Sequence, residues 1–351
     1  MKLGYFTFPI HPKNLSFYKS IKLDEKAIIY ADKLNFNEAF IGEHVTDNYE
    51  KITSNMIFIS NLISKTKKIK LGTGTVNLPN THPVTVASSI SMLDHMSKGR
   101  IIFGIGPGSL VSDMEIYETL EKNRNEMFME SISHIKKLWT SSPPYDLQGK
   151  FWKISTKKTF DKKLSIGYIQ KTLQKPYPEI VVTSLSANND SLIGLCKQKW
   201  NLISSNFLHE HYLKIHGQVL KKNKFKSQNW RMARMIFVNK NKRVIEDYVY
   251  SKKGPFYLMV DQIFNKLKKY KRLEVVRENP DENLNQITTE KLLRRLVICG
   301  DEIKVKDDIQ KLKDTVGNFN TLTYVGEHWR SPKLSMESMK LLSEKIIHKI
   351  K

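Results

Sequence analysis

The chain has 351 residues and a mass of 40.9 kDa; 40% of the residues are hydrophobic, 26% charged and 10% aromatic. This composition excludes a disordered chain, and no apolar run reaches the ~18 residues that a membrane helix needs. The 58 Lys and Arg residues against 35 Asp and Glu give a formal net charge of +23. These basic residues are spread along nearly the whole chain, and no nucleic-acid-binding signature accompanies them. We therefore expect neither a nucleic acid nor a membrane as a partner.

The cysteine content and the N-terminal residues bear on location. Two cysteines, Cys196 and Cys299, cannot form a disulfide framework and favour a reducing compartment. The first ten residues are interrupted by Gly4 and Pro9, so they predict a strand and not a signal peptide. The expected location is the cytoplasm.

Short β-branched strands alternate with amphipathic helices along the chain, which is typical of a parallel α/β sheet. The predicted strands cover residues 2–8, 38–41, 69–76, 100–105, 179–183, 201–205, 230–238 and 321–325. The predicted helices cover residues 22–34, 55–64, 83–96, 123–139, 191–197, 210–220, a region ending near 268, 303–313 and 334–350.

Two segments interrupt this alternation. Residues 141–178, after the fourth helix, are rich in Pro, Gly, Lys and aromatic residues and predict an insertion with a small hairpin. Residues 268–290 are highly charged and contain Pro280, so we expect a mobile loop that is too polar to pack.

Eight strands alternating with helices predict a (β/α)₈ TIM barrel, formed by residues 1–351 as a single domain. The competing fold is a doubly wound open sheet, which would need a glycine-rich phosphate turn directly after the first strand. The residues there are Pro9, Ile10, His11 and Pro12, so the barrel is favoured.

In such a barrel the reactive groups lie in the loops after the C-terminal ends of the strands. Four of these loops carry imidazoles, glycines and hydroxyls, which suit proton transfer, close backbone approach and phosphate binding. They are residues 42–44, 78–83, 104–108 and 184–188. A metal site is not expected because no H-E-x-x-H spacing occurs. The absence of G-x-S-x-G argues against a serine hydrolase.

The sequence resembles the bacterial luciferase-like flavin-dependent monooxygenases in the segment Leu78–Gly108, LPNTHPVTVASSISMLDHMSKGRIIFGIGPG. The opening strand, the Gly42-Glu43-His44 triplet and residues 173–186 resemble the same family, closest to its alkanal and limonene monooxygenase-like branch. The resemblance implies a TIM barrel that binds reduced FMN delivered by a separate flavin reductase. It also implies that dioxygen then oxidises a small apolar organic substrate, and that the protein is a homodimer.

The resemblance also assigns roles to individual residues. His44 matches a histidine beside the flavin ring and is expected to transfer protons. His82 is a second catalytic candidate, although Pro83 begins a helix and His82 would equally hold that turn. Gly74 and Thr75 match the site of an unusual cis peptide beneath the flavin.

Two further loops are expected to contact the cofactor. One supplies Gly106, Pro107 and Gly108, and the other supplies Ser184, Ser186 and Asn188 near the phosphate. The luciferases proper have a cysteine and an arginine where this chain has Gly106 and Pro107. This difference argues against light emission and leaves the phosphate to other donors.

Three other hypotheses about the function remain open beside the monooxygenase. One is a deazaflavin-dependent oxidoreductase on the same fold, and a second is an NAD(P)H-linked oxidoreductase on that fold. The third is a flavin-binding protein without turnover. Residues 268–290 match the position of an active-site lid in the luciferases, where closure would exclude water.

Overall fold

The computed structural model describes residues 1–185 and 189–350. Eight parallel strands of this part of the chain form a closed barrel in the order β1-β2-β3-β5-β8-β9-β10-β12, and β12 pairs back with β1. The barrel strands are β1 (Lys2–Thr7), β2 (Glu38–Ile41), β3 (Lys70–Thr73), β5 (Ile101–Gly106), β8 (Ile180–Ser184), β9 (Asn201–Ser204), β10 (Trp230–Val238) and β12 (Thr321–Val325). The predicted (β/α)₈ fold is confirmed.

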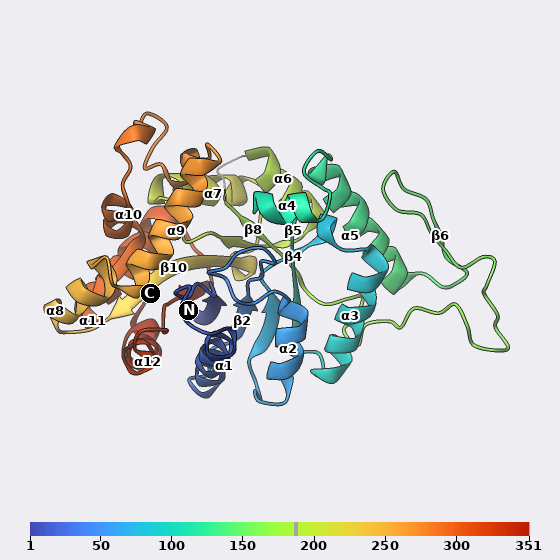
Figure 1. Ribbon diagram of the computed structural model, residues 1–351, viewed down its shortest axis with the longest axis horizontal. Helices are drawn as coiled ribbons and strands as arrows, with labels where there is room; N and C mark the ends of the chain where they lie inside the picture. The colour runs from blue at the N-terminus through green and yellow to red at the C-terminus, as the bar shows by residue number, and fades with distance from the viewer. Residues whose placement is uncertain (186–188, 351) are drawn as a thin grey trace.

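Helices surround this barrel (Figure 1). They are α1 (Phe17–Lys33), α2 (Asn55–Ile63), α3 (Pro83–Met96), α4 (Val111–Ile116), α5 (Arg124–Thr140), α6 (Asn189–Gln198), α7 (Glu210–Lys222), α8 (Lys242–Ile245), α9 (Pro255–Lys269), α10 (Thr289–Leu296), α11 (Glu302–Val316) and α12 (Pro332–Leu341). Short 3₁₀ and π turns lie at Leu78–Asn80, Ser227–Asn229, Glu246–Tyr250, Leu273–Val276, Leu284–Gln286, Leu342–Ile346 and Ile347–Lys349. In this part of the chain no helix has both the length and the apolar character needed to cross a membrane.

The remaining strands lie outside the ring. β4 (Val76–Asn77) extends the path of β3 and pairs with β5. β11 (Val297–Gly300) pairs with the second half of β10 and was not predicted from the sequence. Its four residues follow helix α10 directly, so no Gly, Pro or other turn residue marks where the helix ends and the strand begins.

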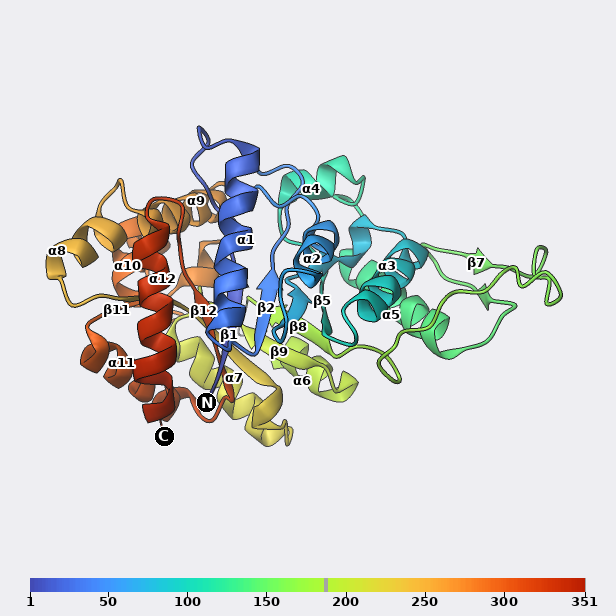
Figure 2. The same ribbon diagram turned by 90° about the horizontal axis from the view of Figure 1, so that it is seen from below.

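The segment between α5 and β8 extends away from the barrel as a long arm, drawn in green in Figures 1 and 2. Its strands β6 (Asp146–Leu147) and β7 (Ile154–Ser155) form an antiparallel pair. The small hairpin expected in residues 141–178 is therefore present.

The prediction that residues 268–290 are too polar to pack is wrong. Leu273, Val275, Val276 and Ile287 are all buried there, in the hydrophobic cluster that also contains residues of α9 and α10. These apolar residues stand singly or in pairs between charged ones, so average polarity hides them. Mobility of the segment stays a prediction.

Alternation along the strands sorts the side chains into two layers. Tyr5 and Leu71 face outward into the cluster under the surrounding helices, whereas Phe6 and Phe40 face into the barrel. At the N-terminal ends of the strands the interior is ionic: Arg231 of β10 donates to Glu38 at 2.6 and 2.8 Å and to Glu179 at 2.6 Å. The bottom of the barrel is thus closed by charge pairs, and its open end lies at the opposite mouth.

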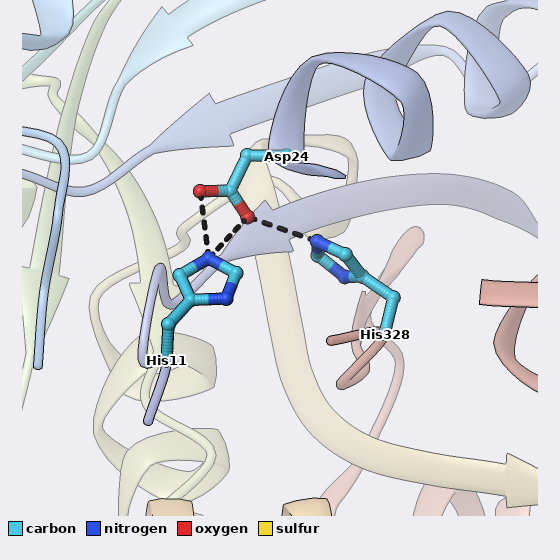
Figure 3. A group of neighbouring side chains, drawn as sticks. All are labelled: His11, Asp24 and His328. Carbon is cyan, nitrogen blue, oxygen red and sulfur yellow. Dashed lines mark hydrogen bonds and ion pairs between the residues drawn. The ribbon is translucent and has the colours of Figure 1, made fainter. Parts of the chain in front are cut away.

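One buried cluster of potential metal ligands occurs in the described residues, formed by His11, Asp24 and His328 (Figure 3). The Asp24 carboxylate accepts hydrogen bonds from His11 Nε2 at 3.1 Å and from His328 Nε2 at 2.9 Å. Burial alone would raise the pKa of Asp24, but the two histidines outweigh it and lower the pKa to about 2. Metal-bound histidines usually donate their other ring N–H, whereas both Nδ1 atoms lack a partner among the described residues. We interpret the cluster as a clamp that joins α1 to the loops after β1 and β12.

Candidate active site

A cavity of about 1050 Å³ opens at the C-terminal mouth of the barrel. Sites for small organic ligands commonly measure about 300–1,000 Å³, so this cavity has room for a flavin-sized molecule and a second, smaller one. Its lining comes from the ends of β1, β2, β3, β5 and β8, from helices α5, α6, α7 and α9, and from residues 270–275. The cavity therefore lies at the C-terminal mouth, where the barrel fold predicts the functional site.

The cavity collects most of the predicted site residues. His44, Gly74, Thr75, Gly106, Pro107, Gly108 and Ser184 all line it. The peptide bond between Gly74 and Thr75 is cis, as the resemblance suggested. Ser186 and Asn188 lie outside the described residues.

His82 takes a different place from the other predicted residues. It is exposed, and its Nδ1 accepts a hydrogen bond from the backbone N–H of Val84 at 3.3 Å, which caps the N-terminus of α3. It is not among the described residues that line the cavity. The structure thus gives His82 the turn-holding position, and a catalytic role for it stays a prediction.

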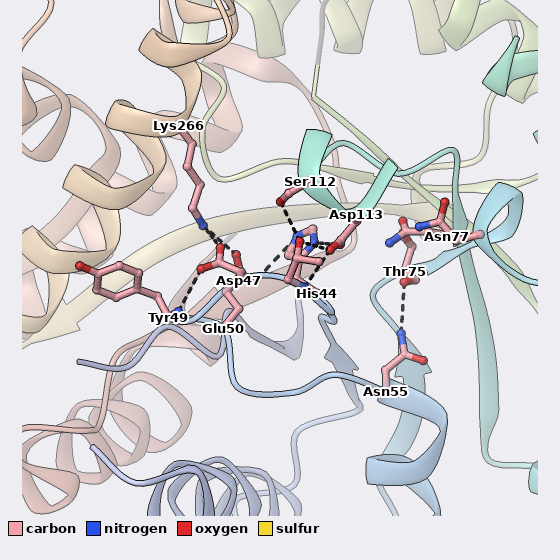
Figure 4. Close-up of polar contacts among 12 residues, drawn as sticks. His44, Asp47, Tyr49, Glu50, Asn55, Thr75, Asn77, Ser112, Asp113 and Lys266 are labelled. Atoms are coloured by element: carbon pink, nitrogen blue, oxygen red, sulfur yellow. Dashed lines mark hydrogen bonds and ion pairs between the residues drawn. The ribbon is translucent and has the colours of Figure 1, made fainter. Parts of the chain in front are cut away.

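His44 lies between two carboxylates (Figure 4). Its Nδ1–H donates to Asp113 at 2.8 Å, and its Nε2 lies 3.9 Å from a carboxylate oxygen of Glu50. Burial alone would lower the pKa of His44, but Glu50 and Asp113 outweigh it and raise the pKa to about 9. The imidazole therefore carries a proton at neutral pH while its side chain is still 20% exposed.

Asp113 was not predicted from the sequence. It lies on α4, a helix of only six residues that follows the glycine-rich turn after β5, too short to show a periodic pattern. Thr46 holds the carboxylate with its backbone N–H at 2.9 Å and its hydroxyl at 2.6 Å. Asp113 therefore fixes the orientation of the His44 ring, as second carboxylates commonly do for functional histidines.

Glu43 is the second titratable group at this wall of the cavity. Burial raises its pKa to about 7, although one carboxylate oxygen accepts the backbone N–H of Asn55 at 2.8 Å. The Asn55 side chain in turn donates to the backbone carbonyl of Thr75 at 3.2 Å. The surroundings thus raise the pKa values of both Glu43 and His44, and displaced pKa values of neighbouring groups in a cavity are typical of functional sites.

The glycines give the cavity walls their shape. A Cβ at Gly106 would lie 2.7 Å from Thr75 Oγ1, and Gly108 has a φ of +79°, which L side chains rarely adopt. Gly194 on α6 also lines the cavity, and a Cβ there would meet no atom within 4 Å in the described part of the chain. Gly194 therefore leaves the cavity wall open at α6, whereas the glycines of the turn after β5 let that turn pack closely against Thr75 and Arg124.

The residues present also offer polar groups for a phosphate. Ser184 ends β8 and Ser191 lies in the first turn of α6, and both line the cavity. The first backbone N–H groups of a helix have no partner within it and favour anions. Arg124 of α5 reaches the turn that lacks the luciferase arginine, but its guanidinium donates to the Pro107 carbonyl and to Thr119 at 2.7 Å. The donor set and the glycine walls together fit FMN.

The fold and this cavity define a (β/α)₈ barrel protein with a ligand-sized cavity at its C-terminal mouth. Residues 1–189 match the family of luciferase-like monooxygenases. The chain belongs to this family.

Two monooxygenases have similar sequences over part of the chain. A 4-hydroxyprotoasukamycin monooxygenase of Streptomyces nodosus subsp. asukaensis is 34% identical over 148 residues, which cover 41% of this chain and 39% of that protein. A limonene 1,2-monooxygenase of Rhodococcus erythropolis is 38% identical over 113 residues, 32% of this chain and 29% of that protein. The chain thus matches less than half the length of these curated relatives.

The fold extends over the whole of a solved structure. The oxygenating constituent of 3,6-diketocamphane monooxygenase from Pseudomonas putida, a type II Baeyer–Villiger monooxygenase in complex with FMN, superposes with a TM-score of 0.87 at 21% identity. The match covers 100% of this chain and 99% of that one. The likeness establishes the common architecture of the two proteins.

Proposed function

We propose that this protein is a flavin-dependent monooxygenase that uses reduced FMN and dioxygen to oxidise a small apolar organic substrate. The observation that carries the proposal is the cavity at the barrel mouth, where glycine walls and the His44–Glu43 pair meet on one side. Bound reduced FMN would supply the electrons that activate dioxygen.

The chain's own residues would handle protons and water. His44, protonated at neutral pH, holds a proton at an imidazole that faces the cavity, and Glu43 exchanges one near neutrality. Phe6, Phe8 and Phe207 line the same space, which supports an apolar substrate and the exclusion of water.

Residues 268–290 serve in this proposal as a lid. Arg272, Glu274 and Val275 of this segment line the cavity, so its movement would open or close the mouth. Delivery of the reduced flavin by a separate flavin reductase is part of the same proposal, because the cofactor would act as a co-substrate.

A homodimer is also proposed. Ile57 on α2 and Met92 on α3 are 74% and 66% exposed, and these two helices are neighbours. Large exposed apolar side chains on adjacent helices support a contact with a second copy.

Anaerobic titration with reduced FMN tests the cofactor assignment. Binding is monitored by protein fluorescence. We expect saturable binding of reduced FMN, weaker binding of oxidised FMN, and no competition from a reduced deazaflavin or from NADPH. Because a Cβ at Gly106 would crowd Thr75, Gly106→Val should weaken the binding. Gly4→Val is the matched control: a Cβ there would also crowd a threonine hydroxyl, that of Thr323 at 3.2 Å, and Gly4 of β1 is not among the described residues lining the cavity. Preference for the deazaflavin would replace the proposal by its oxidoreductase alternative.

A further inference from the structure

Lys266 connects two parts of the site that lie far apart in the sequence. It is on α9, the helix that leads into residues 268–290, and its side chain reaches the loop between β2 and α2 (Figure 4). There its ammonium pairs with Asp47 and lies 3.3 Å from Glu50 Oε1, 216 residues away in the chain. That loop also carries His44.

The two carboxylates share Lys266 as a cationic partner. The side chains of Asp47 and Glu50 are only 5% and 6% exposed, whereas that of Lys266 is 28% exposed. Buried carboxylates are costly unless they are paired. Burial alone would lower the pKa of Lys266, but Glu50 and Asp47 outweigh it and raise that pKa.

Glu50 bridges the lysine and the histidine. One of its carboxylate oxygens faces Lys266, and the other lies 3.9 Å from His44 Nε2. Lys266 therefore holds the Glu50 carboxylate by one oxygen while the other oxygen lies beside the imidazole. The charged groups around His44 are Glu43, Asp47 and Glu50 from its own strand end and loop, Asp113 from α4 and Lys266 from α9.

We infer that Lys266 is a positioning residue: it holds Glu50 beside Nε2 of His44 and ties α9, with the segment that follows, to the loop carrying this histidine. The inference rests on the proposed function for the role of His44. Lys266 acts through Glu50 and also keeps Asp47 and Glu50 from repelling one another.

The direction in which the pKa of His44 changes in Lys266→Met distinguishes a positioning residue from a cation that is only nearby. In Lys266→Met, the two buried carboxylates lose their shared partner, so Glu50 takes up a proton or turns away, and the pKa of His44 falls by about 1 unit. If Lys266 were only a neighbouring cation, Glu50 would stay in place and loss of the positive charge would raise the pKa of His44.

The measurement is an NMR titration of the cofactor-free chain with labelled histidines, with the His44 signals assigned from His44→Asn. Lys266→Arg should keep the wild-type value, and Glu50→Gln should lower the pKa of His44 as Lys266→Met does. Lys269→Met, at an exposed position on the same helix, is the matched control and should change nothing.

A rise, or no change, in the pKa of His44 in Lys266→Met overturns the inference. Should that variant not fold, Lys266→Gln and the Lys266→Met/Asp47→Asn pair give the same comparison, because the pair variant leaves only one carboxylate to satisfy. The titration needs neither cofactor nor turnover. Failure of this inference therefore leaves the monooxygenase proposal intact, and failure of FMN binding leaves the titration valid.

Discussion

His44→Asn is expected to lower the rate of substrate oxidation by about 10²–10⁴-fold, the usual contribution of a positioned acid or base. Binding of reduced FMN should stay close to that of the wild type, because asparagine keeps a polar side chain of smaller size at the cavity wall. The measurement is turnover of an apolar substrate found by screening, together with the fraction of oxygen released as hydrogen peroxide. We expect that fraction to rise.

The pH dependence provides a second readout of the same residue. Because the pKa of His44 is raised from 6.5 to about 9, the protonated imidazole persists at neutral pH and is lost as pH rises through about 9. The wild-type rate should therefore fall above that pH, and His44→Asn should lack this limb. The same sign applies to stability: the contribution of His44 is complete below about 6.5 and disappears as pH rises through about 9.

His82→Asn and His95→Asn are the variants to compare with His44→Asn. His95 is an exposed imidazole on α3 that bonds the Lys171 carbonyl and serves as the control. A loss of turnover in His82→Asn comparable to that in His44→Asn would support the predicted catalytic role of His82. Wild-type turnover in His44→Asn would contradict the assignment of His44.

Arg231→Met is expected to cost about 3–5 kcal/mol of unfolding free energy, because it leaves the Glu38 and Glu179 carboxylates without their cation at the closed end of the barrel. Typical domains have only about 5–15 kcal/mol in total. Chemical denaturation of the cofactor-free protein measures the change. The cavity residues lie at the opposite end, so the loss should appear in stability before it appears in FMN binding.

The double variant Arg231→Met/Glu38→Gln tests the cause of that loss. Neutralising Glu38 removes the buried unpaired charge, so part of the stability should return, since Glu179 is the more exposed of the two carboxylates. A loss below about 1 kcal/mol in Arg231→Met would indicate that the pair contributes little beyond its own desolvation.

Local patterns in the sequence were sufficient to predict the barrel. Each barrel strand is a short apolar run next to turn residues, as at Glu38–Ile41, and the predicted and observed bounds differ by a few residues at most. The family resemblance supplied the contacts of Gly74, Thr75 and Gly106 with the cavity, which periodicity alone does not reveal.

The missed features are short or depend on distant partners. The strand Val297–Gly300 and the helix carrying Asp113 are too brief to establish a period. The ion pairs of Lys266 join residues more than 200 positions apart, so no local sequence pattern indicates them. The charge density of residues 268–290 predicted a segment that does not pack. The prediction is wrong because a few buried apolar side chains are enough to pack such a segment into the hydrophobic core.

The most direct test of monooxygenase activity is reaction of the FMN-loaded, anaerobically reduced protein with ¹⁸O-labelled dioxygen and a panel of apolar substrates, with products analysed by mass spectrometry. We expect one ¹⁸O atom in an organic product, formed only with reduced FMN present, and less hydrogen peroxide than free reduced FMN releases. Release of all the oxygen as hydrogen peroxide, with no labelled product from any substrate and no slowing of flavin reoxidation, would contradict it and favour a flavin-binding protein without turnover.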